Sequence, residues 1–464
     1  MSSISRWSIV FALILATLAE APAIAQSDGR AQAQTPPQVP QTTVLFQNVR
    51  VFDGKGSTLS VPTNVLVRGN KIERISTSPI PVDRSANTTI VNGNGRTLMP
   101  GLIDNHTHLA FWTLPMAFMT TADPGYMQIR QASAAKEFLM AGYTSARDVS
   151  GPVFGMKRAI DEGLVVGPRI WPSGPMISQT SGHSDFRTFA DLPSAAAPAP
   201  IAAIRHSFTA VADGVPEMHK IVRENLMRGA TQIKLAVGGG VSSNFDPIDV
   251  TEYTKVEIEA AVADAENWGT YVTVHGYTPR AIRLAVDAGV KCIEHGQLLD
   301  EPTIKLLAER GIWLSIQPFL LDEDAIPTAP GSDNERKYKQ VAEGTARAYT
   351  LAKKYGVRIA FGTDIQLNLK GAERQAFYLP KLVKWFTPAE ALKQATADNA
   401  QLLALSGERN PYPGKLGVVE EGALADLLLV DGDPLANIRL LEDPGKNLVV
   451  IMKDGKIYKN IVAQ

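Results

Sequence analysis

Five short apolar segments of this chain each end in polar side chains, and together they constrain the fold more than any other feature. The segments are GLIDNHTHL with His106 and His108, TQIKLAV with Lys234, YVTVHG with His275, KCIEHG with His295 and RIAFGTD with Asp364. His106 and His108 are two residues apart, so on a β-strand both imidazoles point to the same face. A (β/α)8 barrel requires this arrangement, because its functional residues gather at the carboxyl ends of its strands.

The segment 100–409 alternates strand patterns with amphipathic helix patterns, which predicts the rest of an α/β barrel. Eight segments have the apolar, β-branched composition of barrel strands: Leu102–His108, Thr144–Val149, Arg169–Met176, Thr231–Val237, Thr270–His275, Lys291–His295, Trp313–Gln317 and Arg358–Thr363. Helix patterns between them include Lys255–Trp268, Pro279–Ala288 and Glu301–Arg310. Eight strands with intervening helices are the number that a closed barrel requires. Residues 178–216 form a long connection after the third strand, and such a connection is usually a functional lid.

Short strands and hairpin turns occupy both ends of the folded region. Residues 42–99 contain TVLFQNVRVF and NVLVRGNKIERIS, and residues 410–464 contain ADLLLVDGDP and LVVIMKDGKIY. The DG, GN and NG steps between alternating segments are hairpin signals. We therefore expect the two segments to form one small β-sandwich domain, into which the TIM-barrel domain at 100–409 is inserted. Residues 26–41 are rich in Gln, Ala and Pro and are expected to be a disordered linker.

Residues 1–25 have the three parts of a secretory signal peptide. Arg6 supplies positive charge, Trp7–Leu18 is an apolar run and Ala23–Ala25 form an A-x-A cleavage site. A membrane anchor is the competing interpretation, but the run is short for a span and no stop-transfer charges follow it. We expect cleavage after Ala25, a periplasmic or secreted protein, and no stable membrane anchor in the mature form.

The composition is that of an ordinary globular protein, with 45% hydrophobic residues, 20% charged residues and a net charge of -1. This leaves ample material for a large core and, with no basic run, argues against a nucleic-acid partner. The single cysteine, Cys292, excludes intrachain disulfides and any cysteine-based metal cluster. Arg147 and Asp148 lie at the end of the second strand candidate and are interpreted as a structural ion pair outside the site.

The polar residues at the strand ends resemble, in identity and order, the metal ligands of the amidohydrolase superfamily. The resemblance extends over nearly all of the chain after residue 41. It implies two divalent metal ions, for which Zn²⁺ is the first choice and Co²⁺ or Mn²⁺ are alternatives. It also implies a carboxylated Lys234 that bridges the two ions. The implied metal ligands are His106, His108, Lys234, His275, His295 and Asp364. The competing interpretations are hydrogen-bonded core histidines, a salt-bridged lysine and an aspartate that caps a helix.

A centre of this kind would activate water for hydrolysis. Two cations lower the pKa of a bridging water, so that hydroxide forms near neutral pH. Asp364 would take the proton as the hydroxide attacks a carbonyl carbon, and would return it to the leaving nitrogen. One metal would polarise the carbonyl oxygen, and a second hydrogen-bond donor would help to stabilise the developing oxyanion.

Three further residues are candidates for catalytic or substrate contacts at the same mouth. His183 lies in SQTSGHSDFR in the long connection, and Tyr277 lies two residues beyond His275 in VHGYTPRAI. These contexts resemble the peptidase-like branch of the superfamily, which includes prolidase-like Xaa-amino-acid dipeptidases and ochratoxin-hydrolysing amidases. In that branch a histidine and a tyrosine at these places contact the substrate. Gly239, in the Gly238–Gly240 run, could bind a carboxylate through backbone amides. The alternatives are a loop-stabilising histidine, a rim tyrosine and a flexible turn.

The resemblance implies that the protein is a hydrolase of C–N bonds, either an amidase or a peptidase. We expect it to cleave the amide bond to a C-terminal amino acid in dipeptides or N-acyl amino acids, with a small-molecule substrate as its partner. The alternative is an ester, lactone, carbamate or urea-type xenobiotic hydrolysed by the same centre. A third hypothesis, a metal-free binding protein on an inactive barrel, conflicts with the intact set of ligands. Relatives in this branch imply a homo-oligomer. The side-chain preference and the choice between amide and ester stay open.

Overall fold

The computed structural model describes residues 42–115, 121–191 and 208–462, which belong to one compact unit. The predicted signal peptide at 1–25, the predicted linker at 26–41 and residues 192–207 of the predicted lid lie outside the described residues. Within the described part, no helix is long and apolar enough to cross a membrane.

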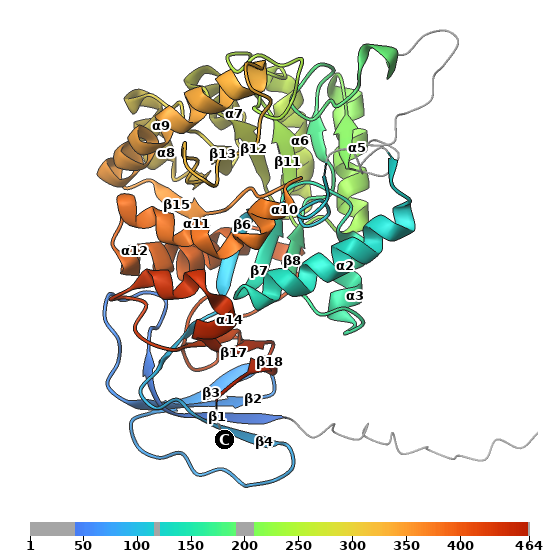
Figure 1. Ribbon diagram of the computed structural model, residues 1–464. Coiled ribbons are helices and arrows are strands. Elements are labelled where there is room, and N and C mark those ends of the chain that lie inside the picture. The colour runs from blue at the N-terminus through green and yellow to red at the C-terminus, as the bar shows by residue number, and fades with distance from the viewer. Residues whose placement is uncertain (1–41, 116–120, 192–207, 463–464) are drawn as a thin grey trace, which may run out of the picture. The chain divides into compact units, whose positions relative to one another are not determined.

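Strands from both ends of the chain form one mixed sheet, in which the blue and red ends of the chain lie side by side (Figure 1). Its members are β1 (Thr43–Val51), β2 (Thr63–Arg68), β3 (Lys71–Ser76), β4 (Thr88–Asn92), β5 (Thr97–Pro100), β16 (Leu427–Val430), β17 (Leu448–Lys453) and β18 (Lys456–Asn460). The order is β18-β17-β16-β5-β1-β2-β3, and β4 pairs with β1. Strand β1 joins two halves of this sheet, because it pairs first with β2 and β4 and then, beyond a bulge, with β5. Alternate residues of these strands, such as Val44 and Phe46, pack into a common apolar core.

The central part of the chain forms two parallel sheets. The three-stranded sheet has the order β6 (Leu102–Thr107), β7 (Tyr143–Asp148) and β8 (Arg169–Pro172). The seven-stranded sheet has the order β10 (Thr209–Val211), β9 (Met176–Ser178), β11 (Ile233–Ala236), β12 (Val272–Gly276), β13 (Cys292–His295), β14 (Trp313–Ile316) and β15 (Arg358–Phe361). Every predicted barrel strand therefore coincides with at least one observed strand.

The third predicted strand, Arg169–Met176, is wrong as a continuous element. The structure has β8 and β9 there, which belong to different sheets. Pro172 and Pro175 lack the N–H group that a sheet ladder needs, and Gly174 between them has a φ of 74°. The backbone turns at this point and leaves one sheet for the other.

Single backbone-to-backbone hydrogen bonds connect the two parallel sheets at both of their seams. The amide of Asp364, beyond β15, donates to the carbonyl of His106 in β6 at 2.9 Å. The amide of Thr231, before β11, donates to the carbonyl of Pro172 in β8 at 2.8 Å. Among the described residues, the strand ladders do not continue across these seams into one closed barrel.

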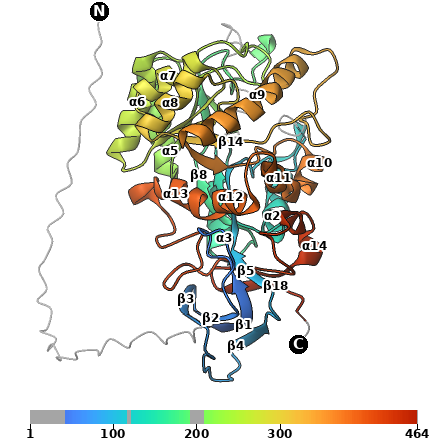
Figure 2. The same cartoon turned by 90° about the vertical axis from the view of Figure 1, so that its left-hand side faces the viewer.

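Helices follow the parallel strands and cover them on the outside (Figures 1 and 2). They are α2 (Pro124–Met140), α3 (Phe154–Asp161), α5 (Val215–Arg228), α6 (Lys255–Asn267), α7 (Pro279–Asp287), α8 (Glu301–Arg310), α9 (Asp333–Tyr355), α10 (Leu369–Glu373), α11 (Gln375–Lys381), α12 (Pro388–Lys393) and α13 (Asn399–Ala404). Helix α14 (Pro444–Asn447) instead precedes β17 and packs against that strand of the mixed sheet. Short 3-10 turns occupy Phe189–Asp191, Leu382–Lys384, Gly407–Arg409 and Ile438–Glu442, and a π-helical turn occupies Gln394–Asp398. The predicted helices α6, α7 and α8 agree within one residue, because their caps are visible in the sequence: Asp300, for example, accepts a hydrogen bond from the Thr303 amide at 2.9 Å.

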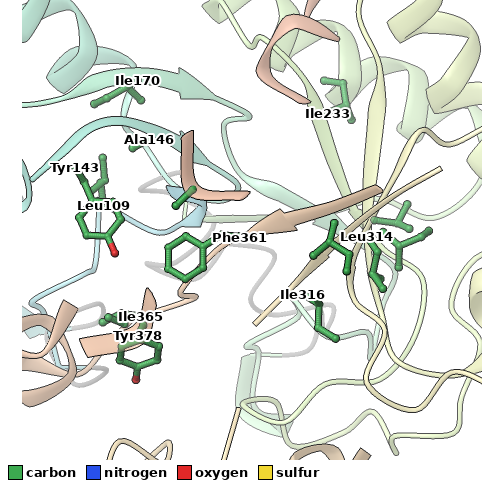
Figure 3. Close-up of a cluster of buried hydrophobic side chains, with 14 of the residues drawn as sticks. Leu109, Tyr143, Ala146, Ile170, Ile233, Leu314, Ile316, Phe361, Ile365 and Tyr378 are labelled. Atoms are coloured by element: carbon green, nitrogen blue, oxygen red, sulfur yellow. The ribbon is translucent and has the colours of Figure 1, made fainter. Parts of the chain in front are cut away.

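The main apolar core lies between the parallel strands and these helices (Figure 3). Leu109, Tyr143, Ile170 and Phe361 belong to it, and none of them is more than 1% exposed. This packing fixes the strands whose carboxyl ends form the candidate site.

Candidate metal centre

His106 and His108 lie at the end of β6, separated by one residue, and both contact the aspartate that follows β15. Asp364 Oδ1 lies 3.2 Å from His106 Nε2 and 3.0 Å from His108 Nε2. These residues offer ligand atoms that all lie within 4.8 Å of one another, and all three side chains are buried. His106 Nε2 and His108 Nδ1 are buried without a hydrogen-bond partner. Imidazole nitrogens and a carboxylate oxygen are the donors that Zn²⁺ binds, so the residues present fit a divalent ion.

Two further histidines stand beside this group. The ring centroids of His295 and His106 are 4.8 Å apart, and those of His275 and His295 are 4.5 Å apart. His295 Nδ1 donates to Gln317 Oε1 at 2.7 Å, and His275 Nε2 donates to the Gly239 carbonyl at 3.2 Å. Each ring therefore keeps its other nitrogen for a ligand, as metal-binding histidines do.

The backbone is strained at two of these positions. His295 has a φ of 80° and Asp364 a φ of 55°, which are left-handed values that residues other than glycine rarely adopt. Such strain persists where surrounding structure imposes it, and it concentrates at functional sites. Both side chains lie beside other ligands, His295 next to His106 and Asp364 next to His108.

Lys234 lies on β11 with its side chain buried, and it lines the same cavity as the histidines. Burial lowers the pKa of its ammonium to about 8, although the charges of Glu294 and Asp364 oppose that shift. The lowered pKa increases the share of the neutral amine, which is the form that can react with CO₂.

Glu294 is a functional residue that the sequence analysis missed. Its carboxylate contacts His106 Nδ1 at 2.8 Å and Arg147 Nη2 at 2.6 Å, and all of these groups are buried. It thus orients His106 with Nε2 toward Asp364. The predicted ion pair between Arg147 and Asp148 is wrong, because Asp148 instead accepts the Leu109 amide at 2.7 Å. The two neighbours in sequence point to opposite faces of β7.

His183 and Tyr277 flank the ring of His275. The His183 ring stacks on it with centroids 3.9 Å apart, and the Tyr277 ring meets it edge-on at 5.0 Å. Both side chains line the cavity. Burial raises the pKa of the Tyr277 phenol well above its usual value, so this hydroxyl stays protonated and can donate.

The Gly239 carbonyl accepts a hydrogen bond from His275 Nε2, and Gly239 is not among the residues that line the cavity. The neighbouring Gly240 amide already donates to Asp246 Oδ2 at 2.6 Å. A substrate carboxylate would have to compete with Asp246 for this amide, and the predicted substrate contact of Gly239 stays a prediction.

The cavity has a volume of about 520 Å³, and two groups among its lining residues differ clearly in character. We call the first the strand-end set; it consists of His106, His108, Lys234, His275, His295 and Asp364. We call the second the connection wall; it consists of Phe111, Phe186, Phe208, Phe319, Ile326 and Pro327. Asp324 also lines the cavity, but Arg374 and Lys381 pair with its carboxylate.

Comparisons with known proteins agree with this geometry. Residues 97–458 match the model of the Amidohydrolase family. Ochratoxinase from Aspergillus niger is 32% identical over 382 residues, covering 78% of this chain and 75% of that protein. A solved amidohydrolase structure is 34% identical with a TM-score of 0.81, covering 91% of this chain and 100% of that chain. A prolidase solved with N-methylphosphonate-L-proline is 32% identical with a TM-score of 0.82, covering 90% and 100%.

These solved structures imply a TIM barrel with an additional domain, as the strand pattern predicted. The metal dependence that is general in the family agrees with the cluster of His106, His108 and Asp364. The chain therefore belongs to the amidohydrolase family and, within its superfamily, to the peptidase-like branch.

Proposed function

We propose that this chain is a binuclear metal-dependent hydrolase that cleaves the amide bond to the C-terminal amino acid of a dipeptide or an N-acyl amino acid. The family, together with relatives named ochratoxinase and prolidase, supports a hydrolase of amide bonds. The observation that carries the proposal is the convergence of His106, His108 and Asp364 in the cavity. In this proposal the parallel strands form a closed (β/α)8 barrel, inserted into a β-sandwich built from both ends of the chain.

The strand-end set would hold two divalent ions, Zn²⁺ or in its place Co²⁺ or Mn²⁺. His106, His108 and Asp364 would hold one ion, and His275 and His295 the other. A carboxylated Lys234 would bridge them; its lowered pKa favours this reaction with CO₂. When bound, the ions would supply Lewis acidity that lowers the pKa of water and polarises a carbonyl group.

Asp364 is the proton carrier in this proposal. Burial alone would raise the pKa of its carboxyl group, but the charge of His106 and the close approach of the His106 and His108 imidazoles hold this pKa well below its usual value. The ionised carboxylate can accept a proton from the attacking water and deliver it to the leaving nitrogen. An amide nitrogen requires this protonation, because it otherwise leaves as a strongly basic anion.

Tyr277 is the candidate donor for the carbonyl oxygen. Its phenol remains protonated, and its ring packs against both His275 and His295, with centroids 5.0 and 5.1 Å away. A donor fixed in a buried site stabilises developing negative charge more strongly than water does.

A hydrolysis screen with mass-spectrometric detection tests the proposal. Full-length protein is loaded with Zn²⁺ in bicarbonate and given dipeptides and N-acyl amino acids beside esters and lactones of matched shape. We expect cleavage of the amides that end in a free carboxylate, and no cleavage by Lys234→Ala.

Other outcomes have defined meanings. Turnover of esters or lactones alone would reject the amide assignment and favour the ester-type alternative. Undiminished amide cleavage after Zn²⁺ is removed with a chelator would reject metal dependence.

A further inference from the structure

A chain of short hydrogen bonds holds one edge of the His183 ring. His183 Nδ1 lies 2.7 Å from Ser243 Oγ, and Ser243 Oγ lies 2.5 Å from Asp246 Oδ2. Ser243 and Asp246 belong to the glycine-rich connection that follows β11, and the two residues are only 2% and 1% exposed. The direct distance from Nδ1 to Asp246 Oδ2 is longer, at 3.5 Å, so Ser243 is the closer link.

The direction of this chain follows from its chemistry. Asp246 Oδ2 also accepts the Gly240 amide at 2.6 Å, and an ionised carboxylate can only accept. Although burial would raise the pKa of Asp246, its interactions with His183 and Ser243 lower it overall, so the group is ionised. The Ser243 hydroxyl must therefore donate its one proton to Asp246. Its oxygen is left to accept a proton from His183 Nδ1.

Helix α9 holds the connection in place. Lys337 Nζ donates to the carbonyls of Gly240, Ser243 and Asp246 at 3.0, 3.1 and 2.7 Å. Gly240 must be a glycine, because a Cβ there would lie 1.8 Å from His183 Nδ1. The connection can thus approach the imidazole edge closely enough for Ser243 to reach it.

The remaining sides of His183 are fixed as well. Its backbone amide donates to Glu252 Oε1 at 2.9 Å, and its ring stacks on His275. Among the described residues, none forms a hydrogen bond with Nε2, and the side chain lines the cavity. Nε2 is therefore the ring atom available to a bound molecule.

We propose that Ser243 and Asp246 are positioning residues that keep a proton on His183 Nδ1 and present Nε2 to the substrate. The inference rests on the proposed function, because it makes His183 a hydrogen-bond acceptor and Tyr277 a hydrogen-bond donor at the same site. In a neutral ring, Nε2 is an acceptor that suits an N–H group of the substrate, while the Tyr277 hydroxyl supplies the donor. His183 would then not be the donor for an oxyanion.

The protonation of the ring can be read without any substrate. Full-length protein labelled with ¹⁵N-histidine is studied by long-range ¹⁵N–¹H correlation spectra, and His183→Gln identifies the His183 signals. We expect a proton on Nδ1 in the unsubstituted protein. Asp246→Ala removes the close acceptor and leaves the Ser243 hydroxyl only the Gly240 carbonyl, 3.5 Å away. We therefore expect this hydroxyl to turn its proton toward Nδ1 and the ring proton to move to Nε2. Asp246→Asn keeps an oxygen at the same place and should retain the original form.

Two results would overturn the inference: an unprotonated Nδ1 in the unsubstituted protein, or a proton that stays on Nδ1 in Asp246→Ala. Should Asp246→Ala fail to fold, Ser243→Ala is the second variant, since it leaves Asp246 and its bond to Gly240 in place. There the nearest acceptor for Nδ1 is 3.5 Å away, and we expect a mixture of the two tautomers. An Nδ1 that stays fully protonated would contradict the role of Ser243.

Steady-state kinetics with any amide that the protein cleaves then tests whether the position of the His183 ring proton affects activity. Because partners that orient an active-site histidine are commonly worth about 10- to 100-fold in activity, we expect this loss in kcat/KM for Asp246→Ala at unchanged metal content. Asp246→Asn should recover most of it. Asp249→Ala is the matched control, because Asp249 is an exposed aspartate of the same connection. The spectra do not depend on the substrate, so failure of the proposed function would leave the inference testable.

Discussion

The strand-end set and the connection wall form two sides of one cavity, and they are built in opposite ways. The first consists of buried polar groups, and several of these ligands have a partner outside the set, such as Gln317 for His295 and Glu294 for His106. The second consists of apolar side chains from connections, including Phe208 before β10 and Ile326 between β14 and α9. Rigid strands hold the groups that perform chemistry, while connections shape the space around them.

The two groups of lining residues also differ in the energetic cost of a substitution. A buried charge is costly unless it is paired, so each member of the strand-end set depends on its neighbours, and one substitution disturbs several of them. An apolar side chain in the wall loses only its own contacts when it is shortened. We therefore expect large, general losses on one side of the cavity and small, substrate-dependent changes on the other.

The largest effect is expected for Lys234→Ala. The change removes the proposed bridge. It also removes the positive charge that interacts with the buried carboxylates of both Glu294 and Asp364. We expect kcat/KM to fall by at least about 1,000-fold, which corresponds to about 4 kcal/mol. Metal analysis of the purified protein should show less than two ions per chain.

A rescue and a control sharpen this test. Added acetate offers a carboxylate that fits the space left by the lysine, and it should restore part of the activity. Lys220→Ala, at an exposed lysine of α5, should keep full activity. An active Lys234→Ala with two bound ions would mean that the strand-end set does not need the lysine.

Tyr277→Phe should have the next largest effect, because it deletes only a hydroxyl group. If this hydroxyl stabilises the developing oxyanion, kcat should fall by about 100-fold while KM and metal content change little. Steady-state kinetics with one amide substrate measures the two constants separately. A raised KM with an unchanged kcat would instead make Tyr277 a ground-state contact. Tyr349→Phe is the control, since the Tyr349 hydroxyl donates to the Ile316 carbonyl in the core, at 3.0 Å.

Much of the strand-end set could be predicted from the sequence, because each ligand directly follows an apolar strand. Periodicity alone aligns His106 with His108, and barrel topology brings the remaining ligands to the same end. Glu294 could not be singled out in this way. It precedes His295 on a fully buried strand, and its importance comes from Arg147 on β7, a residue remote in the sequence. Its only local signal was a charged residue between the apolar Ile293 and the ligand His295.

The split of the third strand and the connection wall were harder to predict for other reasons. Pro172 and Pro175 did signal a break in the sheet, but a barrel pattern favoured one continuous strand. The link from Ser243 and Asp246 to His183 joins two connections about 60 residues apart, and no periodic pattern governs such contacts. The wall likewise depends on loop conformation, which residue types do not determine.

Glu294→Gln tests how far the strand-end set depends on its supporting groups. The change leaves the buried Arg147 without an anionic partner, so we expect the free energy of unfolding to fall by about 3 kcal/mol. The affinity for the metal should fall by about 10- to 100-fold, because His106 loses the carboxylate that orients it. Denaturant unfolding of the chelated protein and a metal-competition titration measure the two effects. The double variant Arg147→Met with Glu294→Gln should recover part of the stability but not of the affinity, and equal recovery of both would contradict this division.

The smallest effect is expected in the connection wall, and it should depend on the substrate. Among the described lining residues, Lys234 is the only lysine or arginine, and Asp324 is already paired, so the wall offers no free charge to a charged side chain. We expect substrates with large apolar side chains to be preferred. Ile326→Ala should lower kcat/KM for such a substrate by about 10-fold, since a few lost methyl groups in an apolar pocket have this effect, and should hardly change it for an alanine-containing substrate. Competition between the two substrates in one reaction gives the ratio directly, with Leu321→Ala as the control, because Leu321 lies in the same connection and is 58% exposed. A uniform loss for both substrates would show that the wall supports the metal centre itself, and the contrast between the two sides of the cavity would fail.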